Sequence, residues 1–490
     1  MNPNRPALPR PLQPRQRRLL QRPALGALAA LAVAAALPGC AMIPAYEQPA
    51  VSVPQHFAYD TPAPQDQAPI QAASLGWKDY FADARLHRLI ELALARNTDL
   101  RKAALNAEAV RQQYMIARAE QLPALGASAG GSRARVAQDL SPSGAAYVAS
   151  SYSVGLGITA YEIDLFGKLR SASEAALQAY LGSAASRDSA HLALVAAVAK
   201  AYFNERYAQQ AMALAQSVLT TREQTYELTQ LKHRSGVVSA LDLRQQEALI
   251  ESAKADYAGA VQARQQALNA LAMLINQPLP EDLPEGLPLA QQFKIERLPA
   301  GLSSEVLLNR PDIRAAEFAL KQANAQIGAA RAAFFPSIRL TSSVGTGSSE
   351  LSGLFGGGNH TWSFAPAITL PIFNWGSLQA NLDAARVRQQ VQIVQYEGAV
   401  QAAFQDVANA LVAREQLQQR HAANTRQSQA YEQALQLVRL RYQHGVASAL
   451  DLLDAERSSY AANMALLANQ LTQLENLADL YKALGGGLKP

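Results

Sequence analysis

The sequence predicts a mainly helical, internally duplicated fold with a small transmembrane β part of four strands. Three observations lead to this prediction. The octapeptide Gly-Val-x-Ser-Ala-Leu-Asp-Leu occurs twice, from Gly236 and from Gly445, and helix-like sequence flanks both copies. Two proline-free stretches, 165–234 and 377–443, are far longer than a typical globular helix. Four short segments alternate apolar with polar or small residues, as strands do.

Each copy of the octapeptide is typical of a tight turn between two antiparallel helices. Its glycine, Gly236 or Gly445, is suited to end a helix in the left-handed conformation. The serine three residues later is suited to cap the next helix, and Asp242 or Asp451 then closes a capping box. The sequence therefore predicts a duplicated helical hairpin as the skeleton of the chain.

The basic charge of the 490-residue chain comes from its N-terminus. The formal net charge is +5, but six arginines and no acidic residue precede Cys40. Without that segment 38 basic and 39 acidic residues remain, so the charge is close to zero. Charge therefore gives no support to nucleic-acid binding.

Residues 1–39 are expected to be a lipoprotein signal peptide. An arginine-rich start is followed by an apolar run over 24–37 and by Leu37-Pro-Gly-Cys40, which holds the only cysteine. This motif resembles the lipobox of bacterial lipoproteins, which implies cleavage before Cys40 and its lipidation. Ala41, rather than aspartate, favours the outer membrane. Residues 40–75 are then a lipidated, Pro-rich tether. The alternative is an ordinary signal peptide followed by a fortuitous cysteine.

The first structural repeat is expected over 76–276. Helical spacing over 86–120 is broken near Asn97, and strands are expected over 125–135 and 152–161. A helix of about 70 residues follows from about Leu165 and would be on the order of 100 Å long. The hairpin at Gly236 leads into a second helix that ends near Ile275.

A Pro-rich connector, 277–302, separates this repeat from a second one over 303–484, and a short tail, 485–490, ends the chain. The second repeat has the same order of patterns. Alternating segments over 338–344 and 362–370 precede the uninterrupted helix 377–443 and the hairpin at Gly445. Each half is therefore predicted as helix, strand pair, very long helix, turn and helix.

Four strands per chain are long enough to cross a bilayer but too few to close a barrel. A tilted strand needs about 9–11 residues to cross. An open sheet edge in lipid leaves backbone groups unsatisfied, at several kcal/mol each, so several chains would have to share one barrel. Tyr152, Phe335 and Trp362, near strand ends, suit an interfacial aromatic girdle. The alternative, a small soluble sheet, stays open at this point.

The duplication, the strand exit Tyr161-Glu-Ile-Asp-Leu-Phe-Gly-Lys-Leu-Arg170 and the twin hairpins resemble the TolC-type outer-membrane efflux proteins over residues 75–484. The lipobox places the chain near their lipoprotein branch, which includes OprM and the NodT type. The resemblance implies a homotrimer with a shared twelve-stranded β-barrel in the outer membrane and a periplasmic α-barrel. It also implies two partners, a periplasmic adaptor protein and an inner-membrane transporter, plausibly of the resistance-nodulation-division type.

The same resemblance implies a gate at the periplasmic tip of the second hairpin. Positions matching Leu450, Asp451 and Asp454 narrow the tunnel, where carboxylates favour cations and an apolar ring gates by dewetting. A polar link between Tyr442 and Asp242 would hold the tip closed. The chain departs from some members at Ala447, where they have an arginine, so one closing link is expected to be missing.

Catalysis is not expected. Gly126-Ala-Ser-Ala-Gly130 fits the Gly-x-Ser-x-Gly elbow as a string, but a Gly-Ser-Arg loop is expected after it instead of a helix. The seven histidines show no metal-ligand spacing, so no metal and no cofactor other than the lipid on Cys40 are predicted. A passive efflux duct for drugs or other small molecules is the function favoured. A protein-secretion duct and a non-pore structural helical lipoprotein remain as alternatives.

Overall fold

The computed structural model describes residues 42–51, 57, 75–295 and 304–489, which form two compact units. The first unit combines 1–45, 116–175 and 324–386, and the second combines 46–115, 176–323 and 387–490. The predicted signal peptide, Cys40 and most of the tether lie outside the described residues. Both hairpin turns belong to the second unit, and the whole sheet belongs to the first.

The order of elements repeats once along the chain, as the sequence predicts. The first set is α3 (Ala84–Arg96), α4 (Thr98–Ala119), β1 (Leu125–Val136), β2 (Tyr147–Ile163), α5 (Lys168–Arg234) and α6 (Ala240–Ile275). The second set is α7 (Pro311–Ala332), β3 (Ser337–Ser348), β4 (His360–Thr369), α8 (Ser377–Gln443) and α9 (Ala449–Ala483). The helices α5 and α8 have 67 residues each. The short elements are α2 (Trp77–Tyr80) and the 3-10 turns η2 (Gln138–Leu140), η3 (Leu289–Gln291), η4 (Ser304–Asn309) and η5 (Leu351–Gly353).

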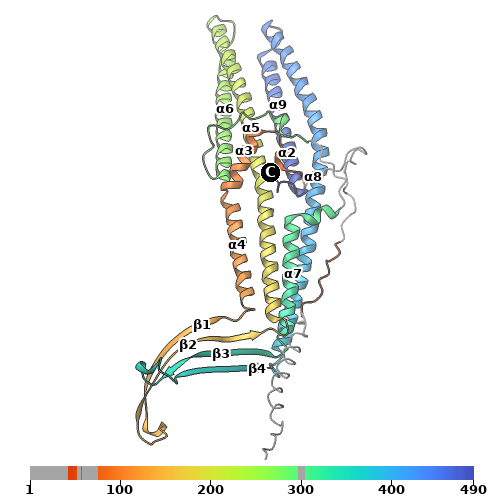
Figure 1. The fold of residues 1–490 in the computed structure, drawn as a ribbon. Coiled ribbons are helices and arrows are strands. Elements are labelled where there is room, and N and C mark those ends of the chain that lie inside the picture. The colour runs from red at the N-terminus through yellow and green to blue at the C-terminus, as the bar shows by residue number, and fades with distance from the viewer. Residues whose placement is uncertain (1–41, 52–56, 58–74, 296–303, 490) are drawn as a thin grey trace, which may run out of the picture. The chain divides into compact units, whose positions relative to one another are not determined.

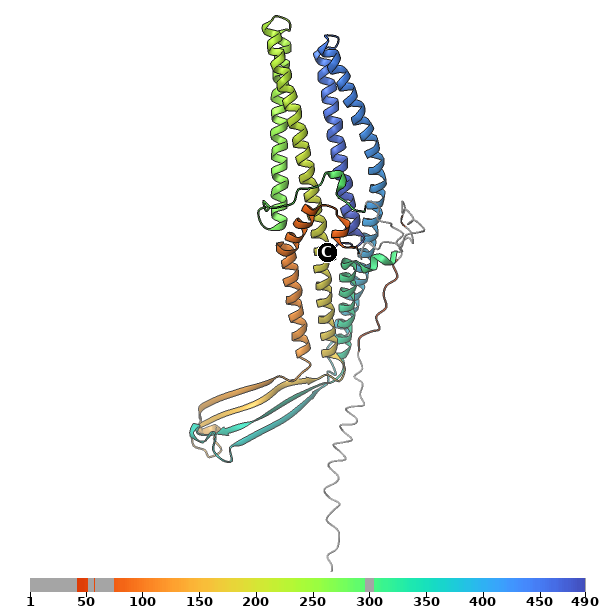
Figure 2. The same cartoon turned by 45° about the horizontal axis from the view of Figure 1, so that its top comes forward.

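Local chemistry explains where the helices begin and end. The predicted break near Asn97 is confirmed, because its Oδ1 accepts from the backbone N–H groups of Asp99 and Leu100 and so caps α4. No proline interrupts α5 or α8, and in Figure 2 each of them folds back on its shorter partner, α6 or α9. Among the described helices, none combines the length and the apolar character that a membrane crossing requires.

The core of the second unit is built around aromatic side chains from both ends of the chain. Trp77, Tyr80 and Phe81 are almost fully buried, and the rings of Tyr80 and Tyr481 stack with their centroids 4.2 Å apart. The Tyr481 hydroxyl donates to the carbonyl of Leu75 over 2.6 Å, and the N–H of Trp77 donates to the carbonyl of Lys489. The beginning of the segment 75–295 and the C-terminal end of the described chain are therefore fixed to each other in this core.

A buried carboxylate, Asp83, connects three segments of the same unit. It caps α3 by accepting from the N–H of Arg85, and it accepts from the hydroxyl of Tyr202 on α5 over 2.6 Å. The N–H of Leu287 and the amide of Gln292, both in the connector, complete its set of donors. Burial and the neighbouring carboxylate raise the pKa of Tyr202. The connector is thus held against α3 and α5 at one point.

The sheet of the first unit is antiparallel with the order β1-β2-β3-β4 (Figure 1), and its two outer strands have open edges in the described residues. Partners across the sheet define two faces. The apolar face carries exposed large side chains from every strand, namely Leu125, Val148, Leu156, Val344, Trp362, Phe364 and Ile368. The opposite, polar face carries small residues such as Ser128, Ser153, Ser343 and Ser363. One face with large apolar side chains and one face with small polar side chains match the alternation of membrane-crossing strands.

Two glycines let β2 and β3 approach each other on the polar face. Gly155 lies directly opposite Gly345, and a Cβ on Gly345 would lie 2.3 Å from the carbonyl oxygen of Val154. No side chain fits there, so the sequence needs glycine at this position.

The expected strand over 125–135 is confirmed as β1, but the Gly-Ser-Arg loop that was expected after Gly130 is wrong. Residues 131–136 continue β1, and Arg133 pairs with Ser150 while Arg135 pairs with Val148. Glycine and serine have low strand propensity, which hides the strand in the sequence. Twelve ladder pairs with the longer strand β2 override that local preference.

The first described residues are bound to α7 within the first unit. Arg331 donates to the carbonyl of Met42 over 3.3 Å, and Asn324 donates to the carbonyl of Pro44 over 2.8 Å. Between these contacts, Gly328 leaves room for the chain, because a Cβ there would lie 2.6 Å from Ile43. Residues 42–44 are therefore held at three consecutive positions.

Candidate functional site

The candidate site is formed by the two hairpin tips of the second unit, and both turns have the same backbone geometry. Gly236 and Gly445 have φ values of +76° and +74°, in the left-handed region. The N–H of Val237 donates to the carbonyl of Lys232, and the N–H of Val446 donates to that of Arg441. This pattern is the Schellman motif, which satisfies the last carbonyls of the incoming helix. Each turn is therefore closed by its own residues.

Both outgoing helices begin with a complete capping box. Ser239 and Asp242 exchange hydrogen bonds at the start of α6, and Ser448 and Asp451 do so at the start of α9. The hydrogen bonds from the side chain and the backbone of Ser239 lower the pKa of Asp242. For Asp451, the bond from the backbone N–H of Ser448 is the largest cause of a lowered pKa. Both carboxylates are therefore held in their charged form at the tips.

The other proposed gate residues, Leu450 and Asp454, are exposed on the first turns of α9. Leu450 is 72% exposed, which is high for a large apolar side chain. Asp454 pairs with Arg457 one turn later, with 2.8 Å between Oδ1 and Nη2. Together with Asp451 they place one apolar and two acidic groups on the first six residues of the helix. This arrangement is suited to a narrow, cation-attracting opening when copies are brought together.

Tyr442 and Asp242 lie close enough to interact electrostatically, although no hydrogen bond joins them in the described chain. Burial raises the pKa of Tyr442, and the charges of Asp242 and Glu456 raise it further. The ammonium of Lys232, on α5, lies 5.3 Å from the centre of the Tyr442 ring. The two hairpins are therefore in contact at this level, and Asp242 is engaged in its capping box.

A second contact between the hairpins was not found by sequence reasoning. Glu456 on α9 pairs with Arg222 on α5, with 2.7 Å between Oε2 and Nη1, and both side chains are only 10% exposed. Arg439 on α8 lies 3.6 Å from the other carboxylate oxygen. One buried acid thus joins three helices from both hairpins.

The duplication relates Glu456 to a glutamate in the first repeat but does not identify this pair. Glu456 lies eleven residues after Gly445, and Glu247 lies eleven residues after Gly236. Glu247 instead pairs with Arg244 on its own helix, where Arg244 is exposed and Glu247 is half-exposed. Equivalent glutamates therefore have different partners, and only spatial information shows which of them is buried.

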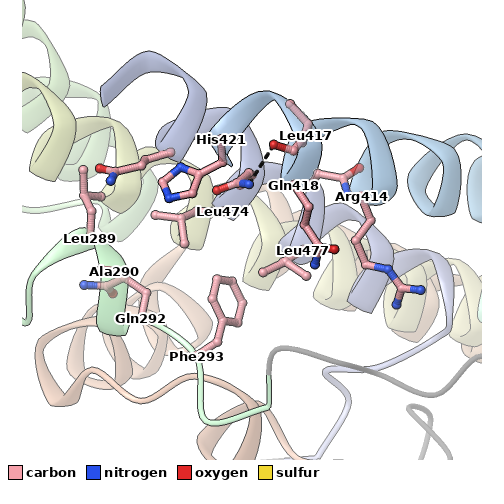
Figure 3. A pocket seen from close by; sticks show the side chains of 13 residues that line it. Leu289, Ala290, Gln292, Phe293, Arg414, Leu417, Gln418, His421, Leu474 and Leu477 are labelled. Carbon is pink, nitrogen blue, oxygen red and sulfur yellow. Dashed lines mark hydrogen bonds between the residues drawn. The ribbon is translucent and has the colours of Figure 1, made fainter. Parts of the chain in front are cut away.

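The second unit also has a cavity of about 290 Å³ between the connector, α8 and α9 (Figure 3). Phe293, Leu474 and Leu477 line it together with polar side chains, and Gln473 donates to the carbonyl of Leu417 at its edge. His421 Nδ1 and Gln292 Oε1 are buried without a hydrogen-bond partner among the described residues. A polar cavity of this size has room for water, which would satisfy these atoms without any other ligand.

The fold and the tip geometry define a class of protein, an outer-membrane channel protein with duplicated helical hairpins. The outer membrane efflux protein family matches residues 89–277 and 302–486, which cover both repeats. The chain therefore belongs to the outer membrane efflux protein family. It is an outer-membrane protein whose helical part lies in the periplasm.

Relatives and solved structures agree with this assignment. The antibiotic efflux pump outer membrane protein ArpC of Pseudomonas putida is 43% identical over 465 residues, 94% of this chain and 95% of that protein. Outer membrane protein OprJ of Pseudomonas aeruginosa is 41% identical over 471 residues, 96% and 97% of the two chains. The MtrE outer membrane channel of Neisseria gonorrhoeae, crystallised in its open state, is 64% identical with a TM-score of 0.84, and the match covers 92% of this chain and 99% of MtrE.

Proposed function

We propose that the chain is the passive exit duct of a tripartite efflux pump and that three copies form one channel. The observation that supports a trimer is that the sheet is open at both edges. Both β1 and β4 have unpaired edges in the described residues, and the apolar face is exposed. In lipid such edges must pair, and the edge of β4 would pair with that of β1 in the next copy. Three copies of four strands would close a barrel of twelve.

The proposed gate is the ring that three second hairpins would form. Asp451 and Asp454 of each chain would place six carboxylates around one axis, with Leu450 as an apolar constriction beside them. Such a ring favours cations, and the capping bonds of Asp451 keep its carboxylates charged. The link between Tyr442 and Asp242 would hold the tip shut in the closed state. The charge of Asp242 acts on the Tyr442 hydroxyl in the described chain, which supports their pairing in the closed state.

The proposed partners are a periplasmic adaptor and an inner-membrane transporter, plausibly of the resistance-nodulation-division type, because a duct has no energy source of its own. The cargo class would be drugs or other small molecules, as the name of ArpC indicates for that protein. The proposed lipid on Cys40 lies outside the described residues and would anchor the N-terminus in the same membrane.

The function and the gate are tested by single-channel conductance of the purified protein in a planar bilayer. We expect discrete conductance steps with cation preference, and we expect Asp451→Asn with Asp454→Asn to reduce that preference and the block by multivalent cations. Asparagine keeps an oxygen for the capping box, so the helix start is preserved. The control is Glu247→Gln with Glu251→Gln on α6, which removes the same charge from the first hairpin.

The outcomes separate the alternatives. No conductance from a folded protein would favour the structural lipoprotein. Conductance steps that are observed only after the adaptor protein is added would still support a gated duct. Equal loss of selectivity in the control variant would show that net charge acts, rather than the proposed ring.

A further inference from the structure

Two arginines lie on the apolar face of the sheet, where charge is unexpected. In the ladder between β1 and β2, Arg133 faces Ser150 and Arg135 faces Val148, which is 53% exposed. Leu125 is on the same face of β1, because it is separated from both arginines by an even number of residues. Neither guanidinium forms an ion pair or a hydrogen bond with the described residues. In contrast, Arg339 on the polar face lies 3.7 Å from Glu162.

The position of these arginines along the strand corresponds to the outer surface of the membrane. All four strands connect to helices at the end that contains Leu125, and the helices of this family are periplasmic. Arg133 and Arg135 follow Leu125 by eight and ten residues, or about 26 and 33 Å along the strand. If the strands are tilted by about 40° from the membrane normal, the two arginines lie about 20 and 25 Å above Leu125 along that normal. The apolar band of such barrels is about 25 Å tall, so the arginines lie at its upper edge.

An aromatic ring lies just below the two arginines on the same face. The side chain of Tyr152 lies over Gly131, since a Cβ on that glycine would be 3.0 Å from the ring. Gly131 and Tyr152 form the ladder pair two positions below Arg133, on the apolar face. Tyrosine is enriched where hydrocarbon meets headgroups. The apolar face therefore passes from hydrophobic residues to a tyrosine and then to two arginines, as it would from hydrocarbon into a charged headgroup layer.

We propose that Arg133 and Arg135 bind the phosphate groups of lipids in the outer leaflet. Guanidinium groups bind phosphate oxygens with two parallel hydrogen bonds, and they are the preferred side chains for this contact. Residues i and i+2 of a strand are about 7 Å apart and point to the same side, so the pair is suited to a headgroup with two phosphates. The site depends on the location of the sheet in the outer membrane and not on the gate at the hairpin tips.

The test is lipid binding to the purified full-length protein in detergent, followed by native mass spectrometry. Diphosphoryl lipid A is the probe, and monophosphoryl lipid A and phosphatidylethanolamine are compared with it. We expect the diphosphoryl lipid to bind most tightly. Arg133→Gln with Arg135→Gln should weaken its binding roughly 20-fold, toward the level of phosphatidylethanolamine. An excess of inorganic phosphate should displace little of the lipid, whereas complete displacement would assign the site to free phosphate and overturn the lipid proposal.

Two further variants make the result decisive. Arg133→Lys with Arg135→Lys keeps the charge and should retain more than half of the bound lipid. Arg101→Gln with Lys102→Gln removes the same charge from exposed positions on α4 and should change nothing. Equal binding to the glutamine variant and the unchanged protein would overturn the proposal, and so would equal loss in the lysine and glutamine variants. Single-channel conductance is measured in parallel, so a failure of the duct proposal is recognised separately.

Discussion

At the scale of single residues, the most informative feature is the acid that joins the two hairpins. Glu456 and Arg222 are each 10% exposed, so each depends on the other for compensation of its charge. Removing one partner of a buried pair is far more destabilising than the pair is stabilising. The contact therefore makes the relative position of α5 and α9 sensitive to a single side chain.

Glu456→Gln is expected to weaken the contact between the hairpins by about 3 kcal/mol, because Arg222 is left buried without a carboxylate. Amide hydrogen exchange in the tip half of α5 and α9 should then be roughly a hundredfold faster where it occurs by local opening. The matched control is Glu247→Gln, which changes the equivalent, half-exposed glutamate and should alter stability by less than about 0.5 kcal/mol. Similar exchange in both variants would contradict a structural role for the buried pair.

Tyr442→Phe is expected to raise the resting conductance of the closed channel. The substitution removes the hydroxyl that would link to Asp242, but it keeps the aromatic ring that the ammonium of Lys232 contacts. A hydrogen bond to a charged acceptor contributes roughly 1.5–3 kcal/mol when shielded from water. Because Ala447 supplies no second link, the effect should be large in this chain. Unchanged resting conductance in planar bilayers would show that the closed state does not depend on this hydroxyl.

At the scale of elements, the tips are held by local chemistry and the capping boxes define their response to pH. The pKa values of Asp242 and Asp451 are lowered from their ordinary value of 3.8. A carboxylate with a lowered pKa in the folded state stabilises the fold at pH values above its ordinary pKa. That contribution is lost as the pH falls through the lowered value, so the caps are fully formed at neutral pH.

We therefore expect the two tip carboxyls to titrate below pH 3.8, and the first turns of α6 and α9 to fray only under more acidic conditions. Carboxyl carbon shifts in aspartate-labelled protein would give both midpoints. Ser448→Ala removes the donor on one tip and should move the midpoint of Asp451 upward, while Asp242 keeps its own. A midpoint of Asp451 that stays unchanged in this variant would refute the capping origin of the shift.

The periodic elements were predictable and the long-range contacts were not. The helices α5, α6, α8 and α9 follow from uninterrupted helical patterns and from two Gly-x-x-Ser turns, which are local signals. The first five residues of β2, Tyr147 to Ser151, were missed because they carry a weak strand pattern, whereas the expected strand 125–135 agrees with β1. The short helix α2 and its stacking on Tyr481 depend on residues about 400 positions apart. No local pattern carries that information, and the same holds for Arg222 and Glu456.

At the scale of the whole molecule, the described chain has an open sheet and exposed gate residues, so its function depends on assembly. We expect native mass spectrometry in detergent to give three times the protomer mass, because the edges of β1 and β4 need partners in lipid. Deletion of β4 with its hairpin to β3 should abolish the trimer. A monomer that keeps its strand content in detergent and in bilayers would rule out the shared barrel.

The contacts of residues 42–44 with α7 have a consequence for where a lipid on Cys40 would sit. Arg331 holds the carbonyl of Met42, and Cys40 is only two residues further toward the N-terminus. Two extended residues span at most about 7 Å. Acyl chains attached at Cys40 would therefore enter the membrane within about 7 Å of Met42, which is itself bound to α7. The lipid would then fix the depth of the sheet in the bilayer. A longer spacer between Cys40 and Met42 would remove this control of depth, although the protein would stay attached to the membrane.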